Sequence, residues 1–176
     1  MTKKEKTSIT TVNTVNESQP KGKKYEELTF SDQFMFGKVM LDSERCRRVL
    51  EMLLQRPIGE LHDVVNEKHM KETVDGKAIR LDIFTRETDS GTLFDAEMQN
   101  QNHQSLDEMN LPKRSRFYQS EIDVNFLAEK GSFRDLAENN IIFICTFDPG
   151  KRGRAFYHYE NKSDENPPVP FRRRDP

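Results

Sequence analysis

Two acidic residues on neighbouring segments are the pair in this sequence best suited to bind a metal ion. Residues 78–85 and 92–99 each alternate polar and apolar side chains, and the segment between them is typical of a turn. We therefore predict a β-hairpin in which Asp82 lies opposite Glu97, with Cβ atoms about 4.5–5.5 Å apart. Two carboxylates that close repel each other unless a cation lies between them. Such a pair is typical of Mg²⁺ sites, where carboxylates act together with water and phosphate oxygens.

The same register gathers five polar residues on one face of the hairpin: Arg80, Asp82, Asp95, Glu97 and Gln99. The opposite face is wholly apolar. One interpretation of the polar face is a metal site that polarises a phosphodiester and supplies hydroxide. The alternative is a solvated polar sheet face, in which Asp82 pairs with Arg80 instead of with a metal ion. The spacing of the residues alone leaves both interpretations open.

Helical and strand patterns surround the hairpin. In chain order we predict helices at 33–40 and 44–55, a strand at 62–67, the hairpin, a helix at 111–130, and strands at 140–147 and 157–159. Asp32 and Asp42 are predicted to cap the first two helices. Pro112 begins the third helix and Gly131 ends it. The segment 140–147 is almost continuously apolar, as in a strand covered on both faces.

Three cations crowd the first turn of the predicted third helix: Lys113, Arg114 and Arg116. Cations at this end of a helix oppose the helix dipole by about 0.3–1 kcal/mol each when exposed. A bound anion would reverse the sign of this effect, because helix N-termini bind phosphates well. One interpretation is therefore a contact to the DNA backbone. The alternative is that Asp107 and Glu108, just upstream, neutralise the cluster.

Composition and charge exclude several classes of protein. The chain has 28 Lys and Arg against 30 Asp and Glu, so its net charge of −2 excludes binding of polyanions by bulk charge. No apolar run approaches about 18 residues, so we expect no membrane span. No apolar run follows the N-terminal lysines as in a signal peptide, and we expect a cytoplasmic protein. The basic segment 150–154 is predicted to be a flexible, solvated turn, with a DNA contact as the alternative.

Apolar residues are scarce at both ends of the chain. Segments 1–24 and 161–176 contain too few of them to stabilise a fold, and we predict disordered polar tails there. The remaining residues, 25–160, are long enough for one domain with a hydrophobic core. Cys46 and Cys145 fit helical and strand patterns, and we expect both to be free thiols in a reducing compartment.

Four segments in this order resemble the Rpn family of recombination-promoting nucleases, often labelled transposases, within the PD-(D/E)XK nuclease superfamily. They are SDQFMFGKVM at 31–40, KAIRLDIFTRETDSGTLFDAEMQNQ at 77–101, LPKRSRFYQSEID at 111–123 and NNIIFICTFDP at 139–149. The resemblance implies an α/β, nuclease-like core with a mixed central sheet flanked by helices. It also implies a DNA endonuclease that hydrolyses phosphodiesters with Mg²⁺ as cofactor, or with Mn²⁺ in its place.

The resemblance also implies roles for the residues of the hairpin. Asp82 matches the first catalytic acid of the family and Glu97 matches the second, and both would bind the metal. Gln99 stands where the superfamily motif has lysine, and glutamine is common there in this family. Because glutamine is neutral, stabilisation of negative charge would fall on the metal or on a cation such as Arg80.

The end of the chain departs from the family pattern. Family members continue well past the strand at 140–147, and we expect this chain to be a C-terminally truncated member. The alternative to an active endonuclease is therefore a catalytically inactive, nuclease-like remnant that binds DNA or a protein partner. An uncovered sheet edge would also favour homo-oligomers.

Overall fold

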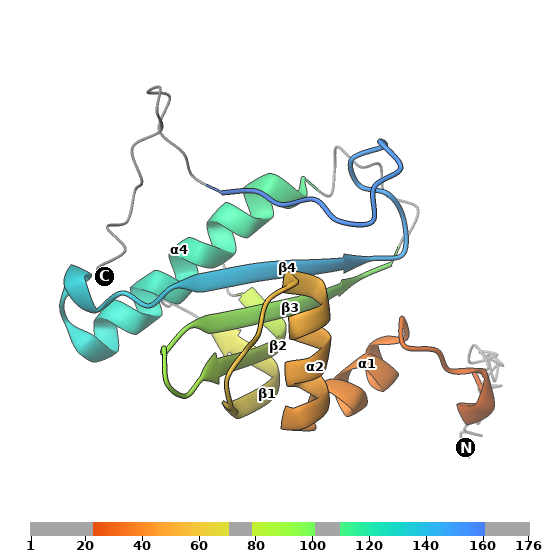
Figure 1. Ribbon diagram of the computed structural model, residues 1–176, viewed down its shortest axis with the longest axis horizontal. Coiled ribbons are helices and arrows are strands. Elements are labelled where there is room, and N and C mark those ends of the chain that lie inside the picture. Colours follow the sequence, from red (N-terminus) through yellow and green to blue (C-terminus); the bar gives the residue numbers. More distant parts are fainter. Residues whose placement is uncertain (1–22, 71–78, 101–109, 161–176) are drawn as a thin grey trace, which may run out of the picture.

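The computed structural model describes residues 23–70, 79–100 and 110–160, and Figure 1 shows the arrangement of their elements. The predicted tails, Asp107 and Glu108 lie outside the described residues, apart from Lys23 and Lys24. The elements are α1 (Gln33–Met40), α2 (Ser43–Leu54), β1 (Leu61–Met70), β2 (Ile79–Glu87), β3 (Leu93–Gln99), α4 (Leu111–Lys130) and β4 (Asn139–Cys145), with short 3₁₀ turns at Tyr25–Glu27 and Phe133–Asp135. No helix in this described part is long and apolar enough to cross a membrane.

The four strands form one mixed sheet in the order β1-β2-β3-β4. The first three strands pair antiparallel, whereas β4 runs parallel to β3. The predicted hairpin is confirmed, and its register near the turn is the predicted one, with Ile83 opposite Ala96 and Thr85 opposite Phe94. The wholly apolar face was wrong, because the ladder ends at Ile83 and Leu81 packs with the opposite hydrophobic cluster from Ile83. The fold class, a mixed central sheet flanked by helices, is confirmed as well.

Each face of the sheet carries its own hydrophobic cluster. On one face, Phe36 and Met40 of α1 and Leu50 of α2 pack with Ile83 and Ala96. On the other face, the α4 residue Ile122 packs with a second set of sheet residues: Ile79, Leu81, Phe84 and Leu93. In Figure 1, α4 runs along the strands on the side away from α1 and α2. The sheet is therefore covered on both faces.

The helix ends test the capping predictions. The carboxylate of Asp42 accepts a hydrogen bond from Arg45 N at 2.9 Å, so the predicted cap of α2 is confirmed. Asp32 lies at the N-cap position of α1 but makes no capping bond to the helix. Its carboxylate instead accepts from Thr29 N at 2.8 Å and pairs with Lys23. The capping role predicted for Asp32 is wrong, because the preceding turn occupies its oxygens.

The predictions for the C-terminal strands hold only in part. The strand predicted at 140–147 is β4, but it lies at the edge of the sheet and all seven of its residues are partly exposed. β4 is therefore less buried than predicted, because it forms the edge of the sheet and has a neighbouring strand on one side only. No strand forms at 157–159, because the Tyr157 hydroxyl donates to Asp148 and folds a loop. Self-association through the edge of β4 stays a prediction.

Phe36→Ala is expected to lower the free energy of unfolding by about 3–5 kcal/mol. The ring is fully buried, and it meets Phe30 edge to face with centroids 5.4 Å apart. Urea denaturation measures the change. Phe34→Ala on the same helix is the matched control, because Phe34 is 58% exposed and should cost about 0.5 kcal/mol or less. Equal losses in both variants would contradict the packing of α1 on the sheet.

Candidate active site

The backbone pairing of β2 with β3 ends at Ile83 and Ala96. Past this pair, carboxylate side chains connect the two strands. Beyond this pair, Asp82 N donates to Glu97 Oε1 at 2.9 Å, and Met98 N donates to Asp82 Oδ2 at 3.2 Å. Each carboxylate is thus fixed by the backbone of the opposite strand. The structure brings Asp82 and Glu97 together, as the register predicts.

The polar face of the hairpin is buried. Asp82, Asp95 and Glu97 are 8%, 0% and 3% exposed, which contradicts a solvated sheet face. Arg114 of α4 contacts Glu97, and Gln33 of α1 contacts Asp82, so helices on both sides of the sheet enclose the acids. Both carboxylate oxygens of Asp95 lack a hydrogen-bond partner among the described residues. Burial of three acids side by side is costly, since charged groups without a cation are poorly stabilised away from water.

Burial dominates the electrostatics of this cluster. Burial and then the negative charge of Asp82 raise the pKa of Glu97 to about 7, against the hydrogen bond from Asp82 N. Burial also raises the pKa of Asp82, although the Met98 N–H, Arg80 and Gln33 oppose the shift. The pKa of Asp95 lies well above its usual range, because of burial and then the charges of Glu97 and Asp82. Without a cation, Glu97 therefore binds and releases its proton near neutral pH.

The metal-free protein is expected to become more stable as the pH falls from 8 to 5.5. Between its unfolded pKa near 4.5 and its folded pKa near 7, Glu97 binds more protons in the folded state, so stability falls as pH rises. The expected difference over this range is about 2 kcal/mol, since most of the change falls between pH 5.5 and the folded pKa of Glu97. Thermal melts in EDTA measure it, and Glu97→Gln should flatten the dependence. The lowered pKa values of Asp32 and Glu44, both about 2, act only below this window. An equal pH dependence in both proteins would contradict the raised pKa.

Arg114 reaches from the first turn of α4 into the carboxylate site. Its Nη1 donates to Gln99 Oε1 at 2.8 Å, and its Nη2 lies 3.4 Å from Glu97 Oε2 and 3.1 Å from the Tyr118 hydroxyl. The guanidinium also lies over the rings of Tyr118 and Phe143, 5.4 and 5.1 Å from their centroids. Arg114 is thus the positive charge that contacts the second acid directly.

This position differs from the one predicted for the basic cluster. The sequence grouped Arg114 with Lys113 and Arg116 as contacts to the DNA backbone. The structure exposes Lys113 and Arg116 at the start of α4, whereas Arg114 turns toward Glu97 and Gln99. The three cations diverge because successive residues of a helix point about 100° apart.

Arg80 lies at the rim of the site. In the register with β1 it is paired with His69, and its guanidinium lies 3.6 Å from the carboxylate of Glu67. Both of these charged side chains are about half exposed. The register predicted for the hairpin would place Arg80 opposite Gln99, but this pairing does not form, because the ladder between β2 and β3 ends before it. The charge of Arg80 still acts to lower the pKa values of Asp82 and Glu97.

Sequence reasoning missed Gln33, the first residue of α1. Its Nε2 donates to Asp82 Oδ1 at 3.3 Å. The available signal was its place beside Asp32 at the start of the first predicted helix. Tyr118 contacts both the core and the site, because it packs against the cluster around Ile122 and accepts a hydrogen bond from Arg114.

The donor set fits a small divalent cation held by two carboxylates. Asp82 and Glu97 supply oxygen ligands that the backbone has already oriented. Within residues 23–70, 79–100 and 110–160, no group of three or more His, Cys, Asp or Glu side chains could hold a metal ion. Water and substrate phosphate oxygens would therefore complete the coordination, which is the usual arrangement for Mg²⁺.

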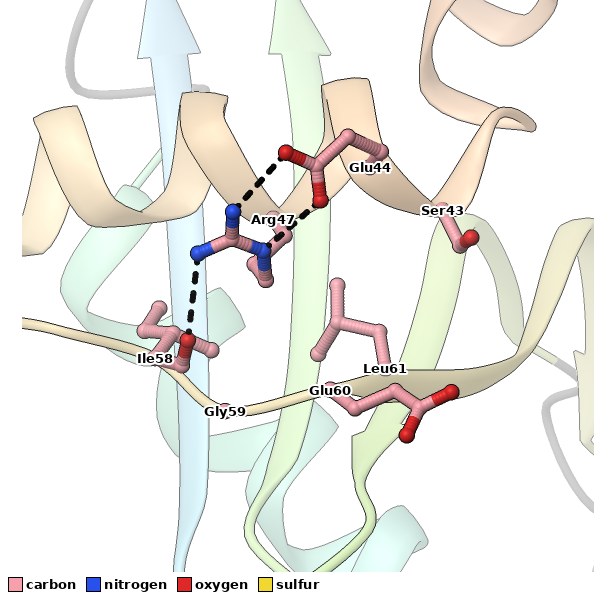
Figure 2. Close-up of a pocket in the computed structure, with 7 residues that line it drawn as sticks. All are labelled: Ser43, Glu44, Arg47, Ile58, Gly59, Glu60 and Leu61. Atoms are coloured by element: carbon pink, nitrogen blue, oxygen red, sulfur yellow. Dashed lines mark hydrogen bonds and ion pairs between the residues drawn. The ribbon is translucent and has the colours of Figure 1, made fainter.

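A separate pocket lies between the start of α2 and the segment before β1 (Figure 2). It has a volume of about 490 Å³ and contains none of the hairpin acids. Arg47 is its cation, and this residue donates to Glu44, Glu51 and the carbonyl oxygen of Ile58. Two carboxylates thus neutralise the guanidinium, which leaves little charge for an anionic ligand.

The fold is a mixed sheet with helices on both faces, and its carboxylate pair lies where two antiparallel strands end their pairing. Together these features are those of an α/β fold of the nuclease type. The family model of the PD-(D/E)XK nuclease family transposases matches residues 33–165, and the chain therefore belongs to this family. The match includes all the elements that build the site, and it confirms the family resemblance of the sequence. No curated protein and no solved structure matches the chain.

Proposed function

We propose that this chain is a metal-dependent endonuclease that hydrolyses phosphodiester bonds in DNA. The observation that carries the proposal is the reciprocal bonding of Asp82 and Glu97 to the opposite strands, at one point of a PD-(D/E)XK family domain. Two buried acids with raised pKa values are costly to the fold unless a cation offsets their repulsion. A metal-binding role accounts for that cost.

The two acids would hold Mg²⁺, or Mn²⁺ in its place. A metal ion held by these acids would polarise the phosphodiester and lower the pKa of a water molecule. Asp82 and Glu97 need little reorganisation for this role, because backbone N–H groups already fix one oxygen of each carboxylate. Gln33 adds a third restraint on Asp82. Such preorganisation reduces the cost of assembling the site during the reaction.

Gln99 and Arg114 would act together on the phosphate. Arg114 donates to Gln99 Oε1, so the amide –NH₂ of Gln99 remains available to orient a phosphate oxygen or the attacking water. The guanidinium of Arg114 supplies the positive charge that Gln99 lacks. Arg114 is better placed for this than Arg80, since it contacts both Glu97 and Gln99 whereas Arg80 lies beside Glu67.

The exposed cations Lys113 and Arg116 would hold the DNA backbone beside the cleavage site. They lie in the same turn of α4 as Arg114, with side chains open to solvent. We also infer a cytoplasmic location, in keeping with a DNA substrate and with the two free cysteines, Cys46 and Cys145.

Cleavage of supercoiled plasmid tests the proposed function. Purified protein should convert the plasmid to nicked or linear DNA with Mg²⁺ and should not do so in EDTA. Glu97→Gln, which keeps the size of the side chain and removes its charge, should abolish the conversion. Absence of cleavage by folded wild-type protein, with Mg²⁺ and with Mn²⁺, would refute the endonuclease in favour of the inactive DNA-binding remnant.

A further inference from the structure

The segment after β4 is folded around one carboxylate. Asp148 accepts hydrogen bonds from Gly150 N at 3.0 Å, from Gly153 N at 2.7 Å and from the Tyr157 hydroxyl at 2.6 Å. The same hydroxyl accepts from Arg152 N at 3.1 Å. A Cβ atom at position 150 would overlap the ring of Tyr157, so glycine is required there. Residues 148–157 thus form a hydrogen-bonded loop, and residues 151–154 are exposed, in keeping with the solvated turn predicted at 150–154.

The loop presents three cations to solvent: Lys151, Arg152 and Arg154. None of them forms an ion pair within the described part of the chain. The carboxylate of Asp148, around which the loop folds, accepts hydrogen bonds from two backbone N–H groups and one hydroxyl. The fold of the loop therefore separates its acid from its cations.

The loop lies at the same end of the sheet as the candidate active site. Cys145, the last residue of β4, is paired with Gln99, and Thr146 N donates to the carbonyl oxygen of Gln99 at 3.0 Å. The loop begins two residues later. Figure 1 shows it beyond the tip of β4, at the end of the molecule where α4 begins. The cations of the loop and those of α4 therefore flank the site.

We propose that the loop formed by residues 148–157 is a preformed second contact to the sugar-phosphate backbone of duplex DNA. The inference rests on the proposed function, because a DNA substrate at this site needs cations beside it that hold the phosphates of its backbone. The net charge of −2 gives no attraction by itself, so binding depends on local groups such as these. A loop that is already ordered gives up little conformational freedom when it binds.

Binding of a fluorescent DNA duplex in EDTA tests the loop without cleavage. Combined replacement of Lys151, Arg152 and Arg154 by alanine should weaken binding more than tenfold at moderate salt. It should also reduce the slope of log K against log salt by about 2 to 3, because each phosphate contact contributes about 0.9. The matched control removes three exposed cations of α1 and α2: Lys38, Arg45 and Arg48. Equal effects in the two triple variants would overturn the proposal in favour of bulk charge.

Asp148→Asn separates the shape of the loop from its charge. The variant makes the protein less negative, so binding should tighten if charge alone matters. An asparagine amide has a single acceptor oxygen, so it cannot satisfy all the donors that Asp148 now holds. We therefore expect binding to weaken several-fold, with an unchanged thermal melt of the rest of the domain. Unchanged or tighter binding would overturn the inference. Plasmid cleavage by the same variants reports on the proposed function separately, since it requires Mg²⁺ and the duplex assay does not.

Discussion

Asp82→Asn is expected to reduce Mg²⁺-dependent plasmid cleavage by about 10³-fold or more, equivalent to about 4 kcal/mol of transition-state stabilisation. Asp82 and Glu97 are the two acids that the strands bring together, and asparagine removes one of the two negative charges that would hold the metal. Cleavage rates over a range of Mg²⁺ concentrations measure the effect. The loss should persist at high Mg²⁺, because the neutral amide is a weak ligand for a hard cation.

The fold should survive this substitution. The asparagine Oδ1 can accept from Met98 N as Asp82 Oδ2 does, and its –NH₂ can donate to Gln33 once the Gln33 amide rotates. Removal of a buried charge next to Glu97 should leave the melting temperature in EDTA unchanged or higher. Unchanged cleavage by the variant would contradict the assignment of Asp82. A lower melting temperature would show that its carboxylate is needed by the fold.

The hairpin and its register could be predicted from the sequence because a strand alternates its side chains with period two. Only registers of one parity place Ile83 with Ala96 on an apolar face and Asp82 with Glu97 on the other. The helices were equally accessible, since Asp42, Pro112 and Gly131 mark their ends. Such local chemistry was enough to define the elements and the acid pair.

The rotation of α4 about its axis could not be fixed from the cluster of cations alone. Of three cations in one turn, only Arg114 faces the sheet, because it shares a side of the helix with Tyr118 and Ile122. The spacing of four residues between them was the available signal. The sequence signal for the loop after β4 was weaker, since the loop depends on a contact between Asp148 and Tyr157, which are nine residues apart.

Arg114→Ala is expected to lower the cleavage rate by about 10²–10³-fold, the usual cost of removing one preorganised donor from a reacting site. The guanidinium contacts Glu97 and orients Gln99, so its loss should appear in kcat more than in DNA affinity. Lys113→Ala and Arg116→Ala are the matched controls on the same turn. They should weaken DNA binding in a salt-dependent way and leave kcat near the wild-type value. If Arg114→Ala showed only a salt-dependent loss of DNA binding, Arg114 would be a contact to the DNA backbone, as first predicted.

Gln99→Lys in the Arg114→Ala background distinguishes two roles of the arginine. The side chains of Gln99 and Arg114 lie 2.8 Å apart, so a lysine at 99 would place an ammonium group close to the lost guanidinium. If Arg114 supplies charge to the reacting phosphate, the double variant should regain at least about tenfold in rate, or about 1.4 kcal/mol. If Arg114 only orients the amide of Gln99, the lysine has no amide to orient and the rate should stay at the level of Arg114→Ala. Recovery of activity would therefore show that the cation of this site can be supplied from either α4 or β3.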